Sequence, residues 1–257
     1  KAKENAPSGP TTDDVFETGK IRTVFERRVS RGRVTVFTSG KGGVGKSTVS
    51  TTIASLLAHE GRKVLLVDTD TGLRTVDAMM GVSESVSANL YDILERRTRW
   101  EDALVMHPGI PNLHIIVSDQ SRNKESIRKD AFDNLILQVA RYFDHVIIDC
   151  PAGVEYGFSM ATGCVDEAFI VVIPEAPSLR GGAQVVRLLE KREVSPLRAI
   201  INRRVEDLEK HGMAPTADEA AATLGIPVVA SIPMDYVVMA CNHAGIPLLL
   251  WDKTPCK

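Results

Sequence analysis

Short, continuously apolar runs alternate along the chain with longer segments whose apolar residues recur at helical spacing. Seven runs predict buried strands, at residues 34–37, 63–68, 113–117, 145–149, 168–173, 197–201 and 228–232. Helical spacing dominates the segments 47–61, 125–142 and 178–191. Strands that are apolar throughout, each followed by an amphipathic helix, are typical of a parallel sheet. The pattern therefore predicts an α/β fold, with a mostly parallel sheet of about seven to eight strands and helices on both faces.

Residues 1–32 lack this alternation and form a polar lead-in that ends in a basic run. The run contains Arg22, Arg27, Arg28 and Arg31, and runs of this kind are usually solvated. We therefore expect a flexible lead-in over 1–32 and one domain over 33–257, because 257 residues are an ordinary length for a single α/β domain. The net charge of -2 gives no general attraction to nucleic acid or anionic lipid.

Cysteine use and hydropathy indicate the compartment. The four cysteines, Cys150, Cys164, Cys241 and Cys256, are widely spaced and form no C-x-x-C pair. No apolar run approaches the ~20 residues that cross a bilayer, and the first residues contain no secretory apolar region. We expect a reducing, cytoplasmic compartment.

A glycine-rich loop follows the first predicted strand. Residues 40–47, GKGGVGKS, fit the phosphate-binding pattern G-x-x-x-x-G-K-[ST] between a strand and a helix. Glycines let backbone N–H groups face phosphate oxygens, Lys46 can reach the β- and γ-phosphates, and Ser47 can ligate Mg²⁺. These features predict a P-loop NTPase. One lysine suffices for this task, so the second lysine of the loop, Lys41, needs a separate role.

Aspartates follow two of the other predicted strands. Asp149 ends the run 145–149, where an acidic residue can hold the magnesium shell of a nucleoside triphosphatase. Asp68 and Asp70 follow the run 63–68, and one can support the magnesium shell while the other orients the attacking water. Ligands of open α/β sheets bind at the carboxyl ends of strands, so we expect these carboxylates beside the loop.

The three motifs "KGGVGKST", "DTDTGLRTVD" and "IIDCPAG" together resemble those of the deviant Walker A ATPases, the MinD/ParA group. Further similarity lies in "IPEAPSLR", "IINRR", "SIPMD" and "NHAGIPLLL", and it is greatest with the MinD branch. The likeness spans about Arg33 to Leu250, in order along the chain.

This resemblance implies roles for particular residues. Lys41 would contact phosphate in the partner subunit of an ATP-dependent homodimer, Lys46 would bind its own nucleotide, and Asp70 would hold the hydrolytic water. Ser47, Asp68 and Asp149 would hold Mg²⁺. The nucleotide-binding positions implied by the family are Gly42, Gly43, Val44, Gly45, Lys46, Ser47, Thr48, Asn202, Arg203, Pro233 and Asp235.

The implied activity is Mg²⁺-dependent hydrolysis of ATP to ADP and phosphate, used to position the division site. Two departures from the family bear on partners. Arg180-Gly181-Gly182 lacks an acidic residue at a helix start, which weakens the expectation of regulators similar to MinC and MinE. After "LLLWDKTPCK" there is no basic amphipathic tail, so we expect either a truncated chain or a member that does not anchor to membrane this way.

Alternatives remain open at this point. A ParA-like or flagellar-number-type ATPase would act on DNA or another cargo with the same chemistry, and the net charge of -2 argues against DNA. An iron–sulfur carrier would need paired cysteines at a dimer face. A scaffold that binds ATP and barely hydrolyses it would share every motif except the water-orienting carboxylate, and the presence of Asp70 favours turnover. For location, the inner membrane surface and a plastid stroma stay alternatives to the cytoplasm.

Overall fold

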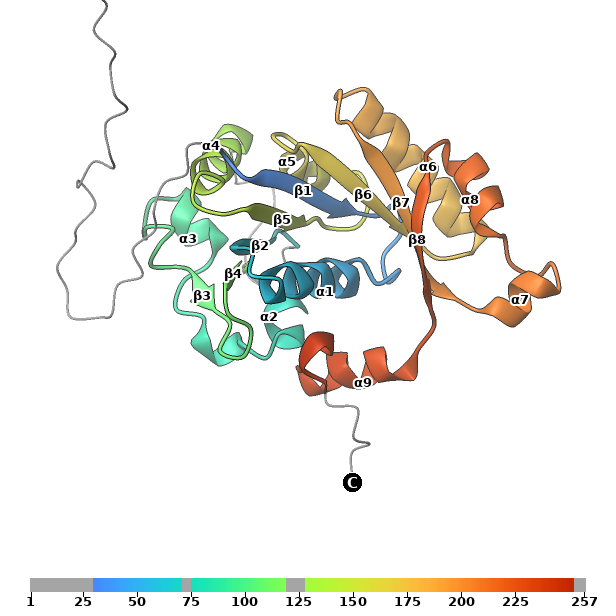
Figure 1. The fold of residues 1–257 in the computed structure, drawn as a ribbon. Coiled ribbons are helices and arrows are strands. Elements are labelled where there is room, and N and C mark those ends of the chain that lie inside the picture. Colours follow the sequence, from blue (N-terminus) through green and yellow to red (C-terminus); the bar gives the residue numbers. More distant parts are fainter. Residues whose placement is uncertain (1–29, 71–74, 119–127, 252–257) are drawn as a thin grey trace, which may run out of the picture.

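A single eight-stranded sheet forms the centre of the protein (Figure 1). The structure, a computed structural model, describes residues 30–70, 75–118 and 128–251. The strands are β1 (Arg33–Thr38), β2 (Val64–Asp68), β3 (Val105–Met106), β4 (Leu113–Ile116), β5 (His145–Asp149), β6 (Glu167–Val172), β7 (Leu197–Arg204) and β8 (Val228–Pro233). They lie in the order β3-β4-β2-β5-β1-β6-β7-β8, and only the β3–β4 pair of the described strands is antiparallel. This confirms the predicted, mostly parallel α/β sheet.

Each of the seven predicted strands is present, with ends that differ by at most three residues. The helices are α1 (Lys46–His59), α2 (Thr75–Met79), α3 (Leu90–Leu94), α4 (Lys129–Val139), α5 (Tyr156–Ala161), α6 (Ala176–Glu190), α7 (Glu206–Lys210), α8 (Ala217–Leu224) and α9 (Tyr236–Ala244). The segments 47–61, 125–142 and 178–191 correspond to α1, α4 and α6. None of the described helices is long and apolar enough to span a bilayer.

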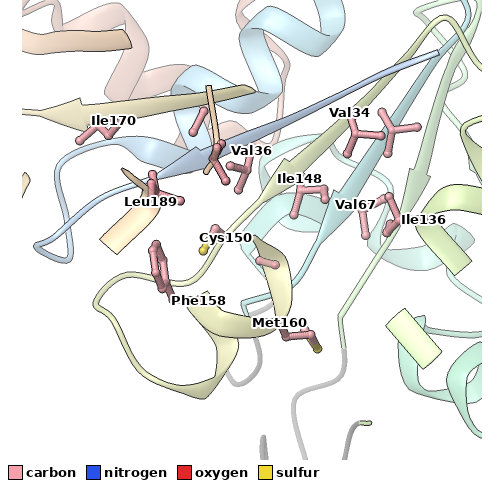
Figure 2. Packing of buried hydrophobic residues seen from close by; sticks show 14 of the residues in the cluster. Val34, Val36, Val67, Ile136, Ile148, Cys150, Phe158, Met160, Ile170 and Leu189 are labelled. Carbon is pink, nitrogen blue, oxygen red and sulfur yellow. The ribbon is translucent and has the colours of Figure 1, made fainter. Parts of the chain in front are cut away.

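The sheet carries one apolar layer on each face. Alternate residues of a strand point to opposite faces, so Leu65 and Val67 join one buried cluster while Val64 and Leu66 join the other. The first cluster includes residues of α3, α4, α5, α6 and α8, and Figure 2 shows Val36, Ile148 and Phe158 within it. The second includes residues of α1 and α2. Helices therefore cover both faces, as the continuously apolar strands predict.

Some predictions lie outside the described residues. They concern most of the lead-in 1–32, including Arg22, Arg27 and Arg28, the family-like residues 72–74, and Cys256. The division into a lead-in and a domain over 33–257 stays a prediction.

Candidate functional site

The carboxyl edge of the sheet collects the residues singled out by the sequence. The glycine-rich loop follows β1, which lies between β5 and β6. Asp149 ends β5 and Asp68 ends β2, and these two residues are paired across neighbouring strands. The strands thus bring the loop and both carboxylates to one edge, as expected for a ligand site of an open α/β sheet.

The loop backbone is shaped to face an anion. Gly43 and Gly45 have positive φ values of 75° and 89°, which favour glycine. Gly45 is the N-terminal cap residue of α1, and no side chain in the described part of the chain bonds to this helix start as a cap. The N–H groups of the first turn, together with the helix dipole, are therefore suited to bind phosphate.

Lys46 lies in a buried cluster around Asp149. Its Nζ is 3.0 Å from Asp149 Oδ1, and the side chains are 7% and 0% exposed. The hydroxyls of Ser47 and Ser50 donate to the same carboxylate at 2.6 and 2.9 Å. Burial lowers the pKa of Lys46, but the charge and hydrogen bond of Asp149 outweigh burial and the pKa is raised. The lysine therefore stays a cation beside the loop.

Asp68 is fully buried next to this cluster. Its Oδ1 accepts a hydrogen bond from the backbone N–H of Asp70 at 2.9 Å, while Oδ2 has no partner among the described residues. Burial, and then the charge of Asp149, raise the pKa of Asp68 well above its usual range. Buried polar atoms without partners are rare. A cation or a water molecule bound at Oδ2 would satisfy this oxygen. Asp70 lies at the rim, partly exposed.

The side-chain oxygens of Ser47, Asp68 and Asp149 suit a Mg²⁺ ion that is also bound by phosphates, rather than a metal ion held by protein ligands alone. The described residues contain no group of three or more His, Cys, Asp or Glu side chains that could hold a metal ion. Mg²⁺ is usually held by one or two carboxylates together with substrate phosphates and waters. The Ser47 hydroxyl, Asp149 and Asp68 supply such a set at the end of the loop.

Lys41 is placed differently from Lys46. It is 42% exposed, and its Nζ is 2.9 Å from Oε2 of Glu175, which precedes α6 and is 53% exposed. The two lysines of the loop thus pair with carboxylates from the two strands flanking β1: Asp149 is the last residue of β5, and Glu175 follows β6 by three residues. Lys41 lies on the outer surface, in agreement with an ammonium that serves another anion, but its contact with a partner subunit stays a prediction.

A cavity of about 270 Å³ opens beside the start of α1. All four residues predicted along the base, Asn202, Arg203, Pro233 and Asp235, line it. Asn202 also donates to the Val44 carbonyl at 2.8 Å, which connects the cavity wall to the loop. The size and largely apolar lining suit a nucleobase.

Some residues that line this cavity were not predicted from the sequence. Val238, Met239 and Asn242 also line the cavity, and the Asn242 amide donates to the Thr48 hydroxyl at 3.1 Å. Asn242 belongs to the family-like stretch "NHAGIPLLL", which was the available signal, yet nothing local in that stretch indicates a contact with the loop.

Two of the cysteines, Cys150 beside the site and Cys164 before β6, have raised pKa values. Cys150 directly follows Asp149 and is buried, and burial raises its pKa to about 12. Burial likewise raises the pKa of Cys164 to about 12. Cys150 follows the last residue of β5, whereas Cys164 precedes the first residue of β6, and both strands run parallel to β1, so the two thiols lie at opposite edges of the sheet. This arrangement gives the iron–sulfur alternative no support.

Comparison with known proteins supports one family. The AAA domain family matches residues 32–201. The septum site-determining protein MinD of Synechocystis sp. is 34% identical over 221 residues, which are 86% of this chain and 83% of that protein.

Two solved structures agree with this match. MinD in the MinC:MinD cell division protein complex of Aquifex aeolicus is 31% identical, with a TM-score of 0.79 over 85% of this chain and 88% of that one. MinD of Pyrococcus horikoshii, complexed with Mg-ADP, is 29% identical, with a TM-score of 0.75 over 84% and 87%. The fold, the two-lysine loop and these relatives together show that the chain belongs to the MinD family of septum site-determining ATPases.

Proposed function

We propose that this protein is an ATP-driven dimerisation switch of the MinD type. It binds ATP with Mg²⁺, pairs with a second copy through the bound nucleotide, and hydrolyses ATP to ADP and phosphate to position the division site. Family membership supports the ATPase activity, and the Mg-ADP complex of the Pyrococcus relative supports the cofactors. Dependence of the activity on Mg²⁺ is part of this proposal.

The separation of the two loop lysines is the observation that carries the proposal. Lys46 is 7% exposed and bonded to Asp149, whereas Lys41 is 42% exposed and bonded to Glu175. Two ammonium groups at one triphosphate of the same subunit would repel each other, and the structure holds them apart. An exposed cation beside a phosphate-binding loop is well placed to reach the phosphate of a partner.

The remaining residues have distinct tasks in hydrolysis. Lys46 and the N–H groups of the loop bind and orient the β- and γ-phosphates. Ser47, Asp149 and Asp68 would hold Mg²⁺, which neutralises charge on the phosphate oxygens when it is bound. Asp70, at the rim and connected to Asp68 by its backbone N–H, orients the attacking water. Asn202, Arg203, Pro233 and Asp235 hold the base.

We also infer that the protein binds a MinC-like partner and associates with the inner membrane surface. The Aquifex relative is found in a complex with MinC, which supports a similar partner here, while a peripheral membrane location rests on family membership. The glycines after Arg180 have packing roles in this chain. A Cβ on Gly182 would lie 2.8 Å from side-chain atoms of Val172 and Leu224. Since these glycine positions are occupied by packing contacts, a partner that binds near the start of α6 would contact the Arg180 side chain.

Sedimentation and phosphate release test the function. With ATP and Mg²⁺ the wild-type chain should form dimers and release phosphate, and with ADP it should stay monomeric. Lys46→Ala should abolish nucleotide binding. Lys41→Ala should keep ATP binding in the monomer but lose dimerisation and turnover. A Lys41→Ala variant that dimerises and turns over normally refutes the contact across subunits.

A further inference from the structure

Glu175, which has no task of its own in binding or hydrolysing ATP, holds the ammonium of Lys41. It occupies the N-terminal cap position of α6, yet its side chain makes no capping hydrogen bond within the described part of the chain. Instead its Oε2 accepts from Lys41 Nζ at 2.9 Å, across 134 residues of sequence. A carboxylate at a helix start normally interacts with the helix N–H groups, so this one is directed away from its own helix toward the loop.

The backbones on both sides of this ion pair are held together. A Cβ on Gly40 would lie 2.1 Å from the carbonyl carbon of Gly181 in α6, so the loop and the helix touch backbone to backbone. The turn before α6 is closed by Ser178, whose Oγ accepts from the N–H of Ile173 at 3.0 Å. The pair therefore connects two anchored segments rather than two independently moving ones.

We propose that Glu175 is a positioning residue for Lys41. It holds the ammonium on the outer face of its own subunit, away from Lys46, until a phosphate of the partner's nucleotide takes the place of the carboxylate. This inference rests on the proposed function, since it assumes that Lys41 acts across the dimer. Because the pair must be given up when the dimer forms, Glu175 opposes dimerisation and restrains the ATP-bound monomer.

The size of the effect follows from exposure. Both side chains are about half exposed, and exposed ion pairs are weak because water screens them. Removal of the carboxylate should therefore tighten the ATP-dependent dimer about twofold to fivefold. The effect should shrink with rising salt, because salt screens the pair that the wild type must break.

The variant Glu175→Gln tests this by analytical ultracentrifugation with ATP and Mg²⁺. Its dimer dissociation constant should fall about twofold to fivefold, with unchanged nucleotide affinity in the monomer. Glu206→Gln is the matched control, because Glu206 forms a surface pair of similar length with Lys210, at 3.0 Å on α7, with both side chains 61% exposed. It should leave dimerisation unchanged. In a Lys41→Ala background, which should not dimerise, Glu175→Gln should fail to restore the dimer, since the carboxylate acts through that lysine.

A second measurement needs no dimer. Acetic anhydride labelling followed by mass spectrometry should modify Lys41 faster in Glu175→Gln than in the wild type, without nucleotide, because a paired ammonium must leave its carboxylate before it reacts. In Glu206→Gln only Lys210 should react faster. Unchanged Lys41 labelling overturns the positioning role, as does weaker dimerisation of Glu175→Gln. A wild-type chain that stays monomeric with ATP overturns the proposed function instead, and the labelling still decides whether Glu175 holds Lys41.

Discussion

Alanine at each of the two loop lysines should affect stability very differently. Lys46→Ala leaves Asp149, which is 0% exposed, without its cationic partner. Loss of one partner of a buried ion pair typically costs about 3–5 kcal/mol. The hydroxyls of Ser47 and Ser50 still donate to Asp149, so we expect the lower end, about 3 kcal/mol. Lys41→Ala breaks a half-exposed pair with Glu175 and should cost at most about 1 kcal/mol.

Urea denaturation without nucleotide measures this difference. For a chain of this size the slope is near the upper end of about 1–3 kcal/mol per M, so Lys46→Ala should lower the midpoint by about 1 M and Lys41→Ala by less than about 0.4 M. Added ATP should raise the midpoint of Lys41→Ala by mass action but leave that of Lys46→Ala unchanged. Equal midpoints for Lys46→Ala and the wild type would refute the reasoning, because the buried pair would then contribute nothing to the fold.

Four further changes test other parts of the structure. Asp70→Ala should keep ATP binding and dimerisation but slow phosphate release about 100-fold or more. Gly40→Ala should cost about 1–3 kcal/mol in urea denaturation, because its Cβ would meet the Gly181 backbone at 2.1 Å. Asn242→Ala should weaken ATP about twofold to tenfold in calorimetry, through loss of its bond to Thr48. Burial lowers the pKa of His107 below 6.5, so stability should fall as pH drops below about 6.5, and less steeply in His107→Gln.

The direction of the pH effect follows from the geometry around His107. Its Nδ1 accepts from the Gly109 N–H at 3.1 Å, which requires an unprotonated nitrogen. Burial lowers the pKa by more than the Nε2 contact with the Met80 carbonyl at 3.0 Å raises it, so the folded protein favours the neutral ring. The unfolded chain binds a proton more readily, and stability is therefore complete above the ordinary pKa and lost below it. His114, whose pKa burial also lowers, shares this behaviour, so the His107→Gln profile should flatten without becoming level.

Much of the fold and of the phosphate site could be predicted because their signals are local. The strand at 145–149 is a run of five consecutive residues. Asp149 is its last residue, and this position in the sequence is enough to place it at the carboxyl edge of the sheet. The loop at 40–47 carries its glycines, lysine and serine at set spacings, each required by the backbone turn around a phosphate. The two-residue β3 and the five-residue α2 and α3 were not predicted, since elements this short show no clear periodicity.

What the sequence left unpredicted depends on contacts between distant segments. Val238, Met239 and Asn242 of α9 have no local mark of a binding site, and they line the cavity beside α1 only because this helix turns from β8 toward α1 and α2 (Figure 1). The partner of Lys41 is similarly set by strand order. Because β6 lies next to β1 in the sheet, the residue that follows β6 by three positions meets the second residue of the loop. On the other flank β5 brings Asp149 to Lys46. One loop with two lysines thus stands between two carboxylates, and the difference in burial decides that one pair stabilises the subunit while the other is weak enough to be exchanged.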